Sequence, residues 1–220
     1  MRRLTIGFLA LSFLALATPV RAQETQLAER RAAVKAEPQE VGPALDLGDA
    51  LHVAGHYPDA LAELRRGVAL AVKGGASNGV EVGRYLIAHV YMDQHLFREA
   101  LNACQAIGQT PIAHACAAEA HMSRRRATDA LPEAELALKD SPKLYEGLVV
   151  QGAAQWLEGS PDEAETAFRA AIAVSPMRAD AHLQLGELYL AQGKREEALK
   201  EFRAPLGDHG KSHLVSPGEL

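Results

Sequence analysis

Residues 141–202 contain two copies of one pattern of apolar and polar positions, and equivalent residues in the two copies are 34 residues apart. Gly193 stands where a left-handed residue would end the first helix of the second copy, and a second helical face follows at Ala198 and Phe202. The pattern predicts a repeated pair of helices. The positions that define the first helix face in the second copy are His182, Leu185, Gly186 and Tyr189.

Small residues extend this register towards the N-terminus. An alanine that follows an acidic residue marks each expected second helix: Ala60, Ala100, Ala130, Ala164 and Ala198. A small residue marks each expected first helix: Gly48, Ala88, Ala118, Gly152 and Gly186. Small side chains allow two helix backbones to approach closely, and a single hairpin cannot bury its own apolar face. The register therefore predicts five stacked helical hairpins, over 41–72, 81–109, 111–142, 145–176 and 179–206.

These residues resemble the tetratricopeptide repeat family. The second copy matches the family pattern at Leu185, Gly186, Tyr189, Ala198 and Phe202. The first copy matches it at Gly152, Ala164, Phe168, Ala171 and Pro176. The resemblance implies an all-α fold, a right-handed superhelical array of about five helix-turn-helix hairpins, with a concave face used for binding.

The first 22 residues are predicted to be an export signal and not part of the fold. A basic start at Arg2 and Arg3 precedes an apolar run from Leu4 to Ala17, and residues 20–22 fit an A-x-A-like cleavage site. An uncleaved membrane anchor is the alternative, although the apolar run is short for a membrane span. With cleavage, no stable membrane insertion is expected, and the protein would be periplasmic or secreted by the bacterial Sec route.

The segments that do not follow the repeat pattern lie before, between and after the hairpins. Residues 23–40 are expected to form a polar spacer or a leading helix, and 41–206 the repeat domain. The glycine-rich segment 72–80 is expected to be a surface loop. Ser160 is expected to cap the helix that begins at Pro161. The tail 207–220 is rich in Gly, Pro and Ser and is predicted to be disordered, so the outer face of the fifth hairpin would be poorly covered.

Charge limits the partners that the sequence favours. The full chain carries a net charge of −5, and loss of three arginines with the signal would make the mature chain more acidic. An acidic surface argues against nucleic acid or an anionic membrane as the main partner.

Two cysteines, Cys104 and Cys116, lie equally far from the expected turn between the second and third hairpins. Residues equidistant from such a turn lie nearly opposite one another, and an exported protein reaches a compartment where disulfides persist. A disulfide between them is one interpretation. Two small buried residues at the hairpin interface are the other.

The nine histidines do not form a recognisable metal motif, and no nucleophile elbow, Walker or dinucleotide glycine pattern occurs. No cofactor, metal or catalytic residue is therefore predicted, and the histidines are expected to be solvated or partly packed. We expect a protein that is not an enzyme.

The concave face is the expected binding surface. The family geometry places a stripe of large side chains along it, and the candidate binding residues are Tyr85, His89, Met92, Met122, Trp156 and Leu190. Such a stripe suits an amphipathic helix or an extended apolar peptide. Nearby acids, Asp49, Glu119 and Glu187, favour a partner with basic residues. The alternative is that the stripe packs against neighbouring helices as core.

The sequence thus predicts an exported, non-catalytic scaffold that binds a protein or peptide in the groove of the array. One alternative is an accessory subunit of an envelope or secretion complex, bound through its last repeat. A small-ligand or metal carrier that uses the histidines is the other.

Overall fold

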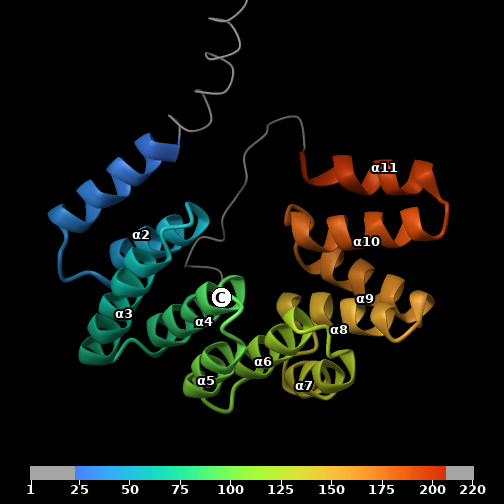
Figure 1. Ribbon diagram of the computed structural model, residues 1–220, viewed down its shortest axis with the longest axis horizontal. Helices are drawn as coiled ribbons and strands as arrows, with labels where there is room; N and C mark the ends of the chain where they lie inside the picture. Colours follow the sequence, from blue (N-terminus) through green and yellow to red (C-terminus); the bar gives the residue numbers. More distant parts are fainter. Residues whose placement is uncertain (1–22, 207–220) are drawn as a thin grey trace, which may run out of the picture. The chain divides into compact units, whose positions relative to one another are not determined.

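In the computed structural model the described residues are 23–206, and they are helical apart from short turns, with no β-strand among them (Figure 1). The expected export signal over 1–22 and the expected tail over 207–220 lie outside the described residues. The elements in chain order are a leading helix over 23–36, α2 (Val41–Val53), α3 (Tyr57–Gly74), α4 (Ser77–Asp93), α5 (Phe97–Ile107), α6 (Pro111–Ser123), α7 (Ala127–Asp140), α8 (Tyr145–Leu157), α9 (Pro161–Val174), α10 (Ala179–Ala191), α11 (Arg195–Arg203) and the short 3-10 helix η1 (Ala204–Leu206).

The helices from α2 to α11 pair into five hairpins, and the pairs coincide with the units expected from the sequence. Each hairpin turns through one residue with a positive φ, and the five are Gly55 (77°), His95 (59°), Arg125 (55°), Gly159 (86°) and Gly193 (77°). Glycine adopts this left-handed conformation without steric cost, whereas other residues rarely do. Three hairpins therefore use the residue best suited to the turn, and two force a larger side chain into it.

The expected surface loop over 72–80 is wrong. Helix α3 continues to Gly74 and α4 begins at Ser77, so most of the segment is helical. Its glycines permit close packing: a Cβ at Gly79 would lie 3.0 Å from Cγ1 of Val41 and 3.1 Å from Cβ of Ala71. The longer step between the first and second hairpins is therefore made by longer helices, with the chain reversing at Gly75, whose φ is 69°.

The cap expected at Ser160 is also wrong, because its side chain makes no capping hydrogen bond. A side-chain cap requires an extended backbone at the capping residue. Ser160 follows a tight turn and has ψ of 72°, whereas Thr110 has an extended backbone with ψ of 156° and accepts a hydrogen bond from the Ala113 N–H at 3.4 Å. The geometry of the preceding turn, and not the residue type, decides which hydroxyl caps a helix.

The chain forms two compact units, and the boundary falls between Gly83 and Arg84, inside α4. In the first unit, glycines bring helices together: a Cβ at Gly48 would lie 2.6 Å from Cγ of Leu64, and one at Gly67 would lie 2.5 Å from Cδ2 of Leu45. Leu27 of the leading helix over 23–36 is buried as well.

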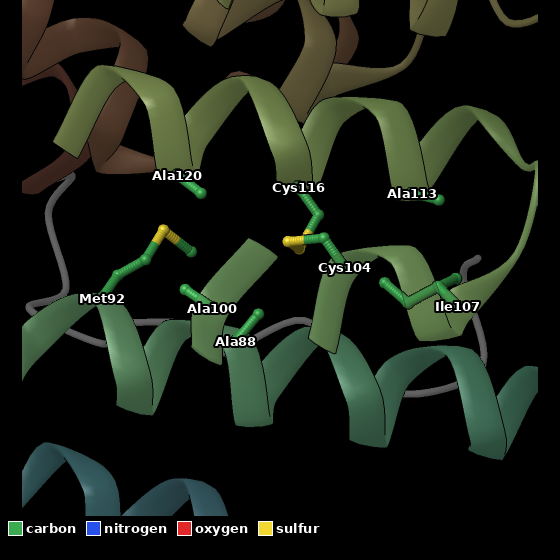
Figure 2. Packing of buried hydrophobic residues seen from close by; sticks show 8 residues of the cluster. All are labelled: Ala88, Met92, Ala100, Cys104, Ile107, Ala113, Cys116 and Ala120. Carbon is green, nitrogen blue, oxygen red and sulfur yellow. A yellow bond between two sulfur atoms is a disulfide. The ribbon is translucent and has the colours of Figure 1, made fainter. Parts of the chain in front are cut away.

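In the second unit, apolar clusters bury residues of successive helices. Helix α6 contacts both α7 and α8, and α10 contacts both α8 and α9. The alanines that marked the second helices of this unit, Ala100, Ala130, Ala164 and Ala198, are fully buried. The cluster in Figure 2 joins α4, α5 and α6 and is built from Ala88, Met92, Ala100, Cys104, Ile107, Ala113, Cys116 and Ala120.

A disulfide lies inside this cluster and joins Cys104 of α5 to Cys116 of α6 (Figure 2). The sulfur atoms are 2.04 Å apart, and the two Cα atoms are 5.5 Å apart. Both residues are buried, so the bond is shielded from solvent. The covalent bond therefore ties the second hairpin to the third.

The small residue on each first helix of the second unit matches the size of the residue 16 positions later. Gly152 faces the ring of Phe168, and Gly186 faces the ring of Phe202. Where alanine replaces the glycine, the later residue is smaller: Ala88 shares a cluster with Cys104, and Ala118 shares one with Ala134. Gly48 and Leu64 of the first unit follow the same rule. Glycine therefore occurs where the residue 16 positions later is large, and alanine occurs where that residue is small.

Candidate protein-binding face

The first helices of the second unit carry a set of polar and apolar side chains, which we call the first-helix face. It comprises the residues Tyr85, His89, Glu119, Glu146, Leu157, Arg178, Asp180 and Leu183. They come from α4, α6, α8, α10 and the residue that precedes α10. In Figure 1, helices α5 and α7 lie along the lower edge of the second unit, with α6 and α8 above them.

Glu119 is the centre of the polar part of this face. The Tyr85 hydroxyl lies 3.0 Å from each Glu119 carboxylate oxygen and donates its proton to them, and Nε2 of His89 lies 3.0 Å from Oε2. The Tyr85 and His89 rings are tilted against one another with centroids 4.5 Å apart. These contacts join the second hairpin to the third and hold the carboxylate in one orientation.

Burial raises the pKa of Tyr85 well above its usual value, and the negative charges of Glu119 and Glu146 act in the same direction. The phenol therefore remains protonated and keeps its role as a donor to Glu119. A phenol held in this way orients a carboxylate and cannot act as a base at neutral pH.

Arg178, the residue before α10, forms the second polar centre. It donates to Oε1 of Glu146 at 2.5 Å and to Oδ2 of Asp180 at 3.1 Å, and its guanidinium carbon lies 3.7 Å from the centroid of the Tyr145 ring. The Tyr145 hydroxyl accepts a hydrogen bond from the Ala181 N–H at 3.0 Å. The fourth and fifth hairpins are therefore joined by a charge pair, a cation–π contact and a hydrogen bond.

Burial acts to lower the pKa of Arg178, but the hydrogen bond to Glu146 and its charge outweigh this and raise it. The side chain of Glu146 is only 10% exposed. Because a buried carboxylate without a partner is costly, Arg178 and Glu146 stabilise the junction only as a pair.

The stripe of large residues expected on this face is only partly exposed. Met92 is buried in the cluster of Figure 2, so its assignment to the binding surface is wrong. Helix α6 covers that end of α4 with small residues such as Ala120, and this leaves room for the methionine. Met122 and Trp156 are half-buried against the apolar clusters of the third to fifth hairpins.

The expected residue Leu190 is exposed, and so are two leucines next to the stripe. Leu157 is 40% exposed, Leu183 is 45% exposed and Leu190 is 49% exposed. Of the expected binding residues, the structure brings Tyr85 and His89 together at Glu119. Glu146 and Arg178 were missed because neither stands at a position that the family pattern assigns to binding. The signal that the sequence offered was a charged residue, Glu146, at the start of the first helix of the fourth hairpin.

Two histidines contact a glutamate across their own hairpins, which the sequence interpretation did not anticipate. Nδ1 of His114 lies 2.8 Å from Oε2 of Glu133, and Nδ1 of His182 lies 2.7 Å from Oε2 of Glu201. Both glutamates follow their histidine by 19 residues. This shared spacing was the signal that could have revealed the pairing, and it shows that these histidines link the two helices of a hairpin.

No group of three His, Cys, Asp or Glu side chains suited to a metal ion occurs within the described range. Likewise, none of the helices between residues 23 and 206 is both long and apolar enough to cross a membrane.

Comparison with known proteins agrees with the helical-hairpin architecture. Residues 155–214 match the model of the tetratricopeptide repeat family, and this range covers the last residues of α8 and the helices α9, α10 and α11. A comparison of the sequence with curated proteins gives no match.

Solved structures of tetratricopeptide repeat and related proteins share the fold. TTC0263, a thermophilic tetratricopeptide protein of Thermus thermophilus, has a TM-score of 0.62 and 21% identity over 76% of this chain and 90% of that one. Yeast Tom70 has a TM-score of 0.61 and 16% identity over 80% of this chain and 38% of that one. A monomeric mutant of IFIT1 with Gppp-AAAA has a TM-score of 0.62 and 16% identity over 84% of this chain and 46% of that one. At these identities the likeness concerns the fold, which is an all-α array of tetratricopeptide-like helical hairpins.

Proposed function

We propose that the protein is an exported, non-catalytic scaffold that binds a protein or peptide on the first-helix face. The observation that carries this proposal is the combination of an oriented carboxylate at Glu119 with exposed leucines at 157 and 183. Surfaces that combine fixed polar groups with accessible apolar side chains are suited to peptide recognition. The match of residues 155–214 to the tetratricopeptide family model supports the same class of function.

The charges of the face indicate the chemistry of the partner. Glu119, Glu146 and Asp180 contribute three carboxylates, and Arg178 is already paired with two of them. A peptide that carries lysine or arginine next to apolar residues complements this pattern. An acidic partner, including nucleic acid, would be repelled.

The polar groups of the face are engaged with one another, which favours binding over catalysis. Tyr85 and His89 both contact Glu119, and Arg178 contacts Glu146 and Asp180. A catalytic group needs access to the reacting atoms and a suitable protonation state. In this face the same groups instead fix the geometry between consecutive hairpins.

Capture of partners from envelope fractions tests the binding proposal. Full-length protein carrying Leu157→Ser together with Glu119→Gln should retain at least roughly tenfold less partner than the unchanged protein, because an apolar contact and a charged contact are both lost. Leu136→Ser is the matched control, because Leu136 is 44% exposed on the second helix α7. Equal capture by both variants would contradict binding on the first-helix face.

Export is proposed from the signal pattern of residues 1–22, and the buried disulfide of the described region supports it, because such bonds persist in oxidising compartments. A periplasmic or secreted location predicts a mature protein whose first residue is Gln23. N-terminal sequencing of protein recovered from the periplasm or medium tests this. Recovery of only the uncleaved chain in the cytoplasm would contradict it.

A further inference from the structure

We propose that the outer face of the fifth hairpin, formed by α10 and α11, binds an amphipathic helix that carries an arginine or lysine at its N-terminal end. This surface shares Asp180 and Leu183 with the first-helix face, but it does not include Glu119 or Leu157, whose replacement tests the proposed function. The residues that define it, which we call the end face, are Asp180, Leu183, Glu187, Leu190 and Leu199.

The fourth hairpin shows how a hairpin of this protein holds a helix on the corresponding face. Helix α10 packs against both α8 and α9. At its N-terminal end Arg178 pairs with Glu146 and lies over Tyr145. Further along, the Tyr189 hydroxyl donates to Oε1 of Glu165 at 2.8 Å.

Apolar contacts accompany these polar ones. Val149 packs against a cluster that includes Ala181, and Trp156 packs against a cluster that includes Leu185 and Leu188. The receiving face of the fourth hairpin is therefore a carboxylate at its start followed by apolar side chains. The bound helix supplies a preceding arginine and an apolar stripe.

The fifth hairpin repeats this arrangement at positions 34 residues later. Asp180 stands at the position of Glu146, Leu183 at that of Val149 and Leu190 at that of Trp156. Leu199 stands at the position of Glu165. The side chain of Asp180 is 59% exposed, and the three leucines are 45%, 49% and 50% exposed, respectively. Among residues 23–206, α10 contacts only α8, α9, α11 and η1, and α11 contacts only α10 and η1.

Charge complementarity selects the occupant. Asp180 shares Arg178 with Glu146, and its exposed carboxylate retains acceptor sites for a second cation. Glu187 replaces Ala153 of the fourth hairpin and adds a second acid next to the leucines. A helix with a basic residue at its start, followed by an apolar stripe, satisfies both features, as Arg178 and α10 do on the fourth hairpin.

A peptide of this chain's own residues 176–192 is a suitable probe, because it contains Arg178 and the apolar face of α10. Labelled peptide should bind the full-length protein saturably in fluorescence anisotropy, with a dissociation constant below about 0.1 mM. Leu190→Ser with Leu199→Ser in the protein should weaken binding more than roughly tenfold. Arg178→Gln in the peptide should weaken it roughly two- to fivefold, as should Asp180→Asn in the protein.

The matched control is Leu136→Ser, which removes an equally exposed leucine from α7 and should leave binding unchanged. Circular dichroism of each variant verifies that the helices remain intact. Undiminished partner capture by Leu157→Ser with Glu119→Gln would contradict binding on the first-helix face and would leave peptide binding at the end face unaffected, so the two proposals fail separately.

Three results would overturn the proposal. Absence of saturable binding, or equal loss with Leu136→Ser, would show that the end face does not recognise this helix chemistry. Binding that emerges only after removal of residues 207–220 would identify those residues as the occupant. Concentration-dependent dimerisation that Leu190→Ser with Leu199→Ser abolishes would identify a second copy of the chain as the occupant.

Discussion

At the residue scale, the packing of each hairpin depends on two positions that share one volume. A Cβ at Gly152 would lie 2.7 Å from Cε1 of Phe168, a distance too short for two carbon atoms. Phe168 is fully buried and cannot move into solvent. The glycine is therefore required by the size of the phenylalanine and not by a special backbone conformation.

We expect Gly152→Ala to destabilise the protein by about 1–2 kcal/mol. Overpacking costs roughly 1–3 kcal/mol, and the higher helix propensity of alanine offsets up to about 1 kcal/mol of this. Combining it with Phe168→Leu should give a destabilisation smaller than the sum of the two single changes, because the smaller side chain makes room for the methyl group. Urea denaturation of the four proteins measures the coupling.

Gly42→Ala is the control for this cycle, since a Cβ at Gly42 meets no atom within 4 Å and the residue is helical. That substitution should be neutral or slightly stabilising. Additive effects of Gly152→Ala and Phe168→Leu would show that the two residues do not compete for the same volume.

The turn residues provide a second prediction at this scale. Gly159→Ala should lower the free energy of unfolding by about 1 kcal/mol, because alanine at a φ of 86° is strained. Arg125→Gly should raise the free energy of unfolding or leave it unchanged. The substitution relieves the strain of a φ of 55° at Arg125, but glycine also has greater entropy in the unfolded chain. Thermal denaturation measures both; a destabilising Arg125→Gly would show that the arginine side chain contributes more than its strain costs.

The sequence identified the small residues of the first helices, and Phe168 and Phe202 as repeat positions, but not the contact between them. Gly152 and Gly186 were visible as a repeat, because identical residues recur at one spacing. The relation between Gly152 and Phe168 is a complementarity of volumes, and at the equivalent positions of the third hairpin two alanines, Ala118 and Ala134, take their place. Such a relation becomes visible only when the distance between side chains is known.

At the element scale, the helix boundaries followed closely from the pattern, and the error over 72–80 has a specific cause. Glycine was interpreted as a loop residue, whereas Gly79 and Gly83 lie in α4 and allow it to approach α2 and α3. Composition alone does not distinguish a glycine that frees the backbone from one that permits close packing.

The disulfide should stabilise the junction of the second and third hairpins. Loop closure over a sequence separation of 12 residues predicts a contribution of about 3 kcal/mol. Cys104→Ala with Cys116→Ala should lower the unfolding free energy by up to this amount, and urea denaturation with and without reductant measures it. If the double variant and the oxidised protein unfold at the same urea concentration, the bond makes no net contribution.

The junction of the fourth and fifth hairpins should depend on Arg178. Arg178→Met removes the partner of the buried Glu146 and should destabilise the protein by about 2–4 kcal/mol. Adding Glu146→Gln should recover part of this loss. Arg169→Met is the matched control: Arg169 pairs with Glu165 but is 61% exposed, so its loss should cost less than about 1 kcal/mol in the same denaturation experiment. Equal effects would show that burial does not govern these pairs.

At the scale of the whole molecule, the second unit is connected hairpin by hairpin. The contacts between its hairpins join consecutive ones, such as α6 with α8 and α8 with α10. In such an array, stability is close to a sum of hairpin and interface contributions. A local change should therefore affect neighbouring hairpins more than distant ones.

Hydrogen exchange measured by mass spectrometry tests this. Gly186→Ala places a Cβ against the Phe202 ring, so exchange should increase in α10 and α11 and, to a smaller extent, in α8 and α9. Helices α5 and α6, which the disulfide joins, should keep their protection. A uniform increase over the second unit would instead indicate a single cooperative structure.

The pairing of Gly152 with Phe168, and of Ala118 with Ala134, has a consequence for how such a chain can lengthen. Both partners of each pair lie within one hairpin. Duplication of a segment of hairpin length therefore copies the matched pair together and leaves the internal fit of the new module intact. Only the boundary with its neighbours must then adapt, which suits this architecture to growth by insertion of whole units.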